Sequence, residues 1–125
     1  MIRDLLLVGA GSAIGGMGRL LMGRAVSAFF PTPFPLATFM VNVAGSLLIG
    51  LLFGWQSRGI LTGSAMLFLS TGICGGFTTF STFSNENVQL IRQGQIGLAL
   101  LYILGSVLLG MAAVFLGYQI GKENM

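Results

Sequence analysis

A glycine- and hydroxyl-rich stretch, residues 72–84 (GICGGFTTFSTFS), lies in a sequence that is otherwise strongly apolar. An unpaired backbone group in hydrocarbon costs several kcal/mol, so non-helical chain survives at membrane depth only inside protein or against a water-filled cavity. Gly72, Gly75 and Gly76 lower the barrier to leaving a helix, and the hydroxyls that follow can satisfy freed backbone groups or a ligand. We therefore expect a broken helix that builds an ion site.

Two aromatic rings and one amide are the side chains here that could face an anion. Phe80 and Phe83 are three residues apart, which places them on one face if the chain is helical there. The edge of an aromatic ring is positive, so it can face an anion without a full charge. On spacing alone, a packing stripe with Phe77 is the commoner explanation. Asn42 could donate its amide to an anion or to a neighbouring helix.

Hydroxyls and a cation could extend an anion path. Four hydroxyl residues are candidates: Ser81, Thr82, Tyr102 and Ser106. The last two are four residues apart and therefore share a helix face. Arg19 follows a charge-free run and must either snorkel to the interface or attract anions into a watery vestibule. Glu86 lies near the same end and could pair with an arginine.

The elements that would position these residues are membrane-spanning helices. The 125 residues are 54% hydrophobic and only 7% charged, and their mean hydropathy is +0.92, which predicts one all-α membrane domain over residues 1–125. Four spans are expected, at about residues 5–22, 36–55, 60–83 and 96–120, with the break in the third and a short helix after it at about 82–90. All three prolines lie in a linker at 27–35. Two pairs of glycines, Gly11 with Gly15 and Gly50 with Gly54, have the small-xxx-small spacing of close helix contacts.

The composition excludes most enzyme chemistry. The chain has one cysteine, Cys74, which is most simply a small buried residue, and it has no histidine and only three acids. Disulfide frameworks, zinc sites and paired carboxylates are therefore excluded within one chain. The six cations do not cluster with aromatics, so nucleic acid is not an expected partner.

The positive charges are divided evenly between the two ends of the predicted bundle. Arg3, Arg58 and Lys122 fall on the side of the termini, and Arg19, Arg24 and Arg92 fall on the other. Because a cytoplasmic excess of Lys and Arg normally fixes orientation, this balance favours dual topology, and the alternative is that one loop dominates and orientation is fixed. Four thin helices cannot enclose a permeation path and also bury Arg19, Asn42 and the broken stretch, so a second copy is expected. In dual topology this pair would be an antiparallel two-fold homodimer.

With these residues in view, the sequence resembles the Fluc (CrcB-type) fluoride channels. The likeness covers nearly the whole chain and is carried by four motifs: GxxxGxxxR at 11–19, VNVAG at 41–45, GGFTTFSTF at 75–83 and SxE at 84–86. The third motif is highly specific. The resemblance implies an antiparallel homodimer in the bacterial inner membrane, with two fluoride pores and a structural sodium ion at its centre. It also implies passive export of fluoride that is trapped when hydrogen fluoride dissociates inside the cell.

The resemblance assigns roles to several residues. It implies that Phe80 and Phe83, rather than Phe77, contact fluoride, and that Asn42 lines the pore. It implies that the backbone carbonyls of Gly75 and Thr78 hold sodium, four oxygens from two copies. It implies a polar track through Tyr102 and Ser106, and one further hydroxyl that some members have on this track corresponds to Gly110 here.

Two other classes of protein have this size and hydropathy. A small four-helix proton-coupled multidrug exporter needs a membrane-embedded carboxylate, and the first segment offers only Asp4 at its very start. A structural or assembly subunit would not require polar residues at mid-membrane and would carry no ion flux.

Overall fold

The computed structural model describes residues 1–123, and every regular element in that range is helical. The elements are α1 (Ile2–Phe29), α2 (Leu36–Ser57), α3 (Gly63–Met66), the π-helical η1 (Leu67–Cys74), α4 (Gly75–Phe77), α5 (Phe80–Arg92) and α6 (Ile96–Glu123). Four helical units, α1, α2, α3 through α5, and α6, are long and apolar enough to cross a membrane. The predicted all-α fold with four spanning helices is confirmed.

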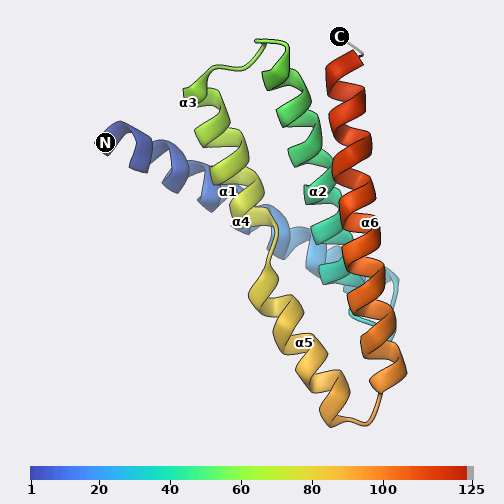
Figure 1. Cartoon of the computed structure of the whole chain (residues 1–125). Helices are drawn as coiled ribbons and strands as arrows, with labels where there is room; N and C mark the ends of the chain where they lie inside the picture. Colours follow the sequence, from blue (N-terminus) through green and yellow to red (C-terminus); the bar gives the residue numbers. More distant parts are fainter. Residues whose placement is uncertain (124–125) are drawn as a thin grey trace.

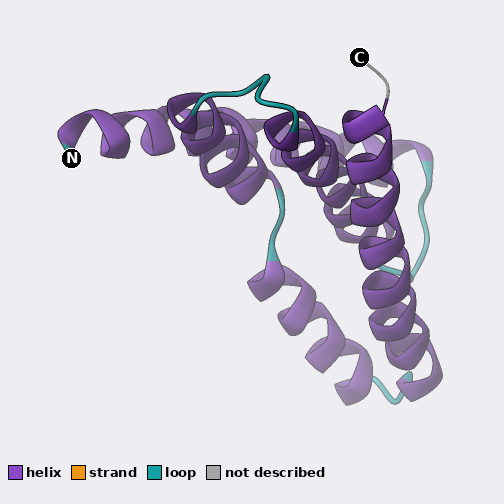
Figure 2. Cartoon of the chain, turned by 45° about the horizontal axis from the view of Figure 1, so that its top comes forward, coloured by secondary structure: helices purple, strands orange, loops and turns teal. Residues whose placement is uncertain are grey.

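The bundle is built on two helices that run side by side in the same direction, α2 and α6, which form the most extensive helix pair (Figure 1). The α3–η1–α4 unit returns beside α2 and packs mainly on α1, and α5 then leads down to the start of α6 (Figure 1). Helix α1 crosses the others obliquely, so that its first turns project from the bundle (Figures 1 and 2). The start of α1, the loop between α2 and α3 and the end of α6 lie toward one end of the molecule, as four crossings require (Figure 1).

Glycines allow the helices to touch backbone to backbone. A Cβ on Gly50 would lie 2.9 Å from the Cα of Val114 in α6, and one on Gly15 would lie 2.8 Å from the amide nitrogen of Phe77 in α4. Both distances are shorter than real Cβ contacts, so no other residue fits at these two positions without a shift. The contacts that were predicted from the small-xxx-small pairs in α1 and α2 are therefore confirmed, and each pair has its own partner helix.

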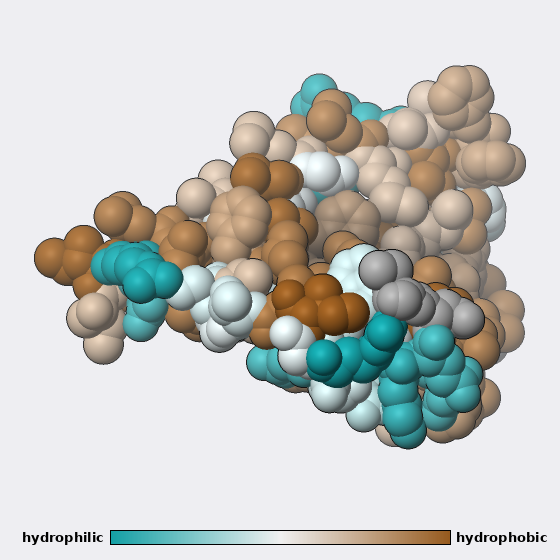
Figure 3. Space-filling model, turned by 90° about the horizontal axis from the view of Figure 1, so that it is seen from above, coloured by the Kyte–Doolittle hydropathy of each residue, from teal (hydrophilic) through white to brown (hydrophobic). Residues whose placement is uncertain are grey.

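The interior of a single chain is small, and its surface is largely apolar. Two buried clusters form the core, one around Leu52, Met66 and Cys74 and the other around Leu90, Ala99 and Tyr102. Viewed from the end that carries the termini, hydrophilic residues gather in two groups while the flanks are mostly hydrophobic (Figure 3). Large apolar side chains on α6, including Leu108 and Phe115, are more than half exposed. Such flanks suit a lipid environment.

The predicted break in the third span is present, but it is shorter than the glycine-rich stretch. Helical structure continues through η1 and α4 to Phe77, and only Thr78 and Thr79 are extended, with φ/ψ of −87°/159° and −150°/121°. Gly72 and Gly76, which were expected to ease departure from the helix, both lie within helical structure, before the residues at which the chain leaves it. These glycines instead let η1 and α4 approach α1, because a Cβ on Gly72 would lie 2.9 Å from the Cα of Gly11.

The helix that follows the break is longer than predicted. It was expected at about 82–90 and runs from Phe80 to Arg92. Its first turn is capped by Thr79, whose side chain accepts a hydrogen bond from the Thr82 amide at 3.3 Å. The proline linker, expected at residues 27–35, is also shorter than predicted. Helix α1 continues through Phe29, so the irregular chain between α1 and α2 is confined to residues 30–35.

Candidate functional site

The break between α4 and α5 is held open by one asparagine of α2. The Asn42 side-chain oxygen accepts a hydrogen bond from the Thr79 amide at 2.9 Å, and its nitrogen donates to the Thr79 carbonyl at 3.1 Å. Asn42 thus pairs with both backbone groups of an extended residue that has left the helical ladder. The amide nitrogen still has a second hydrogen to donate, since an asparagine carries two.

Side chains supply hydrogen bonds at the C-terminal end of α4, in addition to the backbone bond from the Thr78 amide to the Cys74 carbonyl at 3.0 Å. The Thr78 hydroxyl donates to the Cys74 carbonyl at 2.9 Å, and Arg19 donates from Nε to the Gly76 carbonyl at 3.1 Å. The carbonyl of Gly75 would be paired with the Thr79 amide in a continuous helix, but that amide is bound to Asn42. The described residues supply the Gly75 carbonyl with no other donor. Its oxygen is therefore available to a ligand.

A cavity of about 670 Å³ lies beside this break, and we call it the break cavity. It is lined by six of the residues that the sequence singled out: Asn42, Gly75, Thr78, Phe80, Phe83 and Ser106. They come from α2, from both sides of the break and from α6, which are far apart along the chain. The hydroxyl oxygen of Ser106 is buried and has no hydrogen-bond partner in the described part of the chain.

The aromatic residues of the break divide between two environments. Phe80 is 79% exposed in the single chain, and its ring centroid lies 6.0 Å from that of Phe83. Phe83 also packs edge-on against the buried ring of Tyr102, at 4.8 Å. Phe77 instead points between α1 and α2, where it approaches Gly18 and Gly45. Phe77 is therefore a packing residue, and the other two form the aromatic lining of the break cavity.

A second cavity, of about 580 Å³, lies on the α1 side of the break and is called here the arginine cavity. Its polar lining is made by Arg19, Arg24, Ser27, Thr38, Thr79 and Thr82. Thr79 lines both cavities and so marks the point at which they approach each other. Ser81 lines neither cavity, and it is exposed with its hydroxyl 3.5 Å from that of Thr79.

Glu86 joins three elements, and the idea that it pairs with an arginine is wrong. Its carboxyl oxygens accept hydrogen bonds from the Thr38 hydroxyl at 3.0 Å and from the Tyr102 hydroxyl at 2.8 Å. Tyr102 is fully buried and lines neither of the two cavities. Its hydroxyl is thus turned toward α5 rather than toward Ser106 and the break cavity.

Thr38 is a site residue that the sequence reasoning missed. It is 8% exposed, lines the arginine cavity and donates to Glu86. The signal that could have found it is spacing, because Thr38 stands four residues before Asn42 and thus on the same face of α2.

Comparison with known proteins supplies the family. A family model described as "CrcB-like protein, Camphor Resistance (CrcB)" matches residues 6–118. A fluoride-specific ion channel FluC of Flavobacterium psychrophilum is 43% identical over 98% of this chain and 99% of the relative. The FluC protein of Thermus thermophilus is 46% identical over 93% of each chain, and that of Nitrobacter winogradskyi is 44% identical over 93% of each.

These relatives are ion channels and not enzymes, in agreement with the composition. Together with four helices that can span a membrane, they identify an integral protein of the bacterial inner membrane. The similarity extends over almost the full length of both chains, and the family model includes the asparagine of α2, the break and the serine of α6. The chain therefore belongs to the CrcB family, whose curated relatives are the FluC fluoride channels.

Proposed function

We propose that this chain forms a passive, fluoride-selective channel in which the break cavity is part of the pore. The observation that carries the proposal is the convergence of the Asn42 amide, the Phe80 and Phe83 rings and the unpartnered Ser106 hydroxyl on one cavity at a helix break. All four are neutral groups that can face an anion with a positive edge or a donor hydrogen. Neutral contacts can replace part of a hydration shell without holding the ion too tightly to leave.

The path of the ion follows from the order of these groups. Arg19 and Arg24 make the arginine cavity positive, which raises the local concentration of anions at its mouth. Thr82 and Ser81 offer hydroxyls on the first turn of α5, next to Thr79. The second amide hydrogen of Asn42 and the Phe rings come next, and Ser106 follows. Tyr102 supports the Phe83 ring from behind and is tied to Glu86, so we assign it a positioning role beside the pore.

The functional unit is proposed to be an antiparallel homodimer with two pores. A ring that contacts a permeating ion must be enclosed, yet Phe80 is 79% exposed in one chain, so another surface has to cover it. A second copy related by a two-fold axis would supply that cover twice. Three Lys or Arg residues near each end of the bundle give the chain little preference for one orientation.

A sodium ion fits the backbone at the break. The Gly75 carbonyl has lost its helical donor, Thr78 lies outside both helices, and both residues line the break cavity. The described residues contain no group of three acidic, cysteine or histidine side chains that could hold a metal, so carbonyls are the donors on offer. Two such carbonyls from each copy would give four oxygens for a monovalent cation. The ion would supply fixed positive charge between the two pores.

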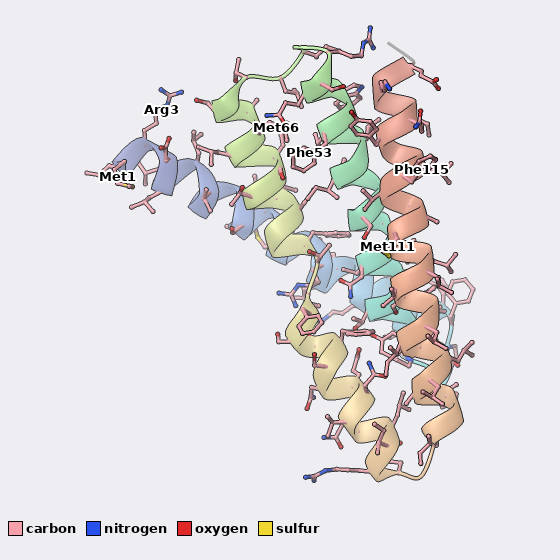
Figure 4. All side chains as sticks on the ribbon, in the orientation of Figure 1. Met1, Arg3, Phe53, Met66, Met111 and Phe115 are labelled. Carbon is pink, nitrogen blue, oxygen red and sulfur yellow. The ribbon has the colours of Figure 1, made fainter. Side chains whose placement is uncertain are left out.

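Efflux from liposomes tests the channel. The purified protein is reconstituted in vesicles loaded with potassium fluoride, and valinomycin sets the voltage while an electrode records external fluoride. We expect efflux that follows the voltage and is lost in Phe80→Ala and Phe83→Ala. Phe115→Ala is the matched control, because this ring projects away from the bundle on α6 (Figure 4). Proton-coupled uptake of an organic cation, or no fluoride efflux at all, would refute the proposal.

Labelling from each side of the membrane tests the topology separately. Gln95 is exposed in the loop before α6, and a cysteine there can react with a membrane-impermeant maleimide. The antiparallel dimer predicts that about half of the Gln95→Cys copies react from either side of intact vesicles made in both orientations. Labelling of all copies from one side only would show a single fixed orientation and exclude dual topology.

A further inference from the structure

One serine of α2 lines the break cavity, and its hydroxyl makes no hydrogen bond to the rest of the described structure. Ser46 lines this cavity together with Asn42 and Ser106. Its hydroxyl makes no hydrogen bond to any described residue, although a serine in a helix often bonds to the carbonyl four residues before it. The hydroxyl hydrogen is therefore free to be donated into the cavity.

The packing of α2 on α6 places Ser46 opposite Gly110, a residue of α6 that has no side chain. These helices run in parallel with one register: Gly50 lies against Val114, and one turn earlier Gly110 lies against Ser46. A Cβ built on Gly110 would be 3.6 Å from the Ser46 hydroxyl oxygen. Gly110 is the position at which the hydroxyl track along α6 ends, one turn after Ser106. Ser46 thus occupies the space beside the residue that has no side chain to offer.

We propose that Ser46 continues the hydroxyl lining of the pore past Ser106 and contacts the permeating anion there. The inference rests on the proposed fluoride conduction. The lining then crosses from α6 to α2, so that the wall opposite Gly110 provides the donor. Asn42 and Ser46 lie four residues apart on one face of α2, so a single helix supplies two consecutive donors to the ion.

The test is the removal of this hydroxyl and its replacement from the opposite helix. Ser46→Ala is expected to lower fluoride efflux from liposomes roughly two- to tenfold, the range for one neutral hydrogen bond. The double variant Ser46→Ala with Gly110→Ser is expected to recover most of that loss. A Cβ at position 110 would make only an ordinary contact, at 3.6 Å from the Ser46 hydroxyl oxygen, and Ser46→Ala removes that oxygen, which leaves room for a new hydroxyl. A structural role for Ser46 would not be rescued by a hydroxyl on another helix.

Ser57→Ala provides the matched control, since it makes the same change on α2 outside the cavity, where the hydroxyl donates to the Gly54 carbonyl. Its efflux should equal that of the unmodified protein. Unchanged efflux in Ser46→Ala would overturn the inference, and so would a reduced efflux that the double variant does not recover. If the unmodified protein carries no fluoride, the proposed function fails instead. Size-exclusion profiles of every variant establish that the comparison is between equally folded proteins.

Discussion

Replacing Asn42 with leucine tests whether the asparagine maintains the break as well as facing the ion. The change removes the hydrogen bonds of 2.9 Å and 3.1 Å to the Thr79 amide and carbonyl. A buried donor or acceptor left without a partner costs about 1–3 kcal/mol. Two such groups would cost about 2–6 kcal/mol, and because Asn42 and Thr79 are only half-buried we expect the lower part of this range, about 2–3 kcal/mol.

Thermal unfolding in detergent and fluoride efflux from liposomes measure the two consequences. Asn42→Leu should melt at a lower temperature than the unmodified protein and should conduct no fluoride. Asn85→Leu makes the same substitution at an exposed position of α5 and should change neither property. Asn42→Asp keeps the acceptor for the Thr79 amide but loses the donor to its carbonyl. Its melting temperature should therefore lie between those of Asn42→Leu and the unmodified protein.

The outcomes separate the two roles of this side chain. Loss of efflux in Asn42→Leu with an unchanged melting temperature would mean that Asn42 only contacts the ion and that the break does not depend on it. Unchanged efflux would refute the reasoning altogether, because neither the amide donor nor the open Thr79 backbone would then be required.

Three further predictions concern packing, charge and sodium. Gly76→Ala should destabilise the protein by about 1–3 kcal/mol, because the added Cβ would meet the backbone of Ser12, whereas Gly9→Ala, with open space around it inside α1, should not lower the melting temperature. Arg19→Gln should lower fluoride efflux and weaken its dependence on ionic strength, since an anion-attracting charge is lost, and Arg92→Gln at the exposed end of α5 serves as the control. Replacing sodium by N-methylglucamine during purification should lower the melting temperature of the protein, and equal melting temperatures in the two cations would contradict the proposed carbonyl-bound sodium.

The architecture could be predicted because the length of apolar runs and the spacing of small residues indicate where membrane helices lie and how they pack. Apolar runs of the right length gave the four helical units, and Gly11 with Gly15 and Gly50 with Gly54 gave the faces that pack most closely. The existence of a break followed from a stretch rich in both glycine and hydroxyl residues at membrane depth. Local chemistry was sufficient in these cases, since each signal acts over one or two helical turns.

The position of the break could not be predicted in the same way. Glycine was interpreted as a helix breaker at Gly72 and Gly76, but there it serves close contact with α1, and the two uses look identical in a sequence. The chain leaves the helix at Thr78 and Thr79, where the Thr78 hydroxyl bonds to the Cys74 carbonyl and the Thr79 backbone bonds to Asn42 of α2. Asn42 is 37 residues away from Thr79 along the chain, so the position of the break depends on a tertiary contact.

Glu86 illustrates why charge counting is a poor guide to partners inside a membrane. Six cations are present in the chain, and an arginine was the expected partner, yet the carboxyl group is bound by two hydroxyls from α2 and α6. An arginine paired with this carboxyl group would be lost as an attractor for anions. With Glu86 held by Thr38 and Tyr102, Arg19 is free of it and instead donates to the Gly76 carbonyl at the mouth of the break. Because the half-buried Glu86 is bound by hydroxyls and does not line the arginine cavity, its charge is not paired with Arg19 or Arg24, and the positive field that would attract anions there is preserved.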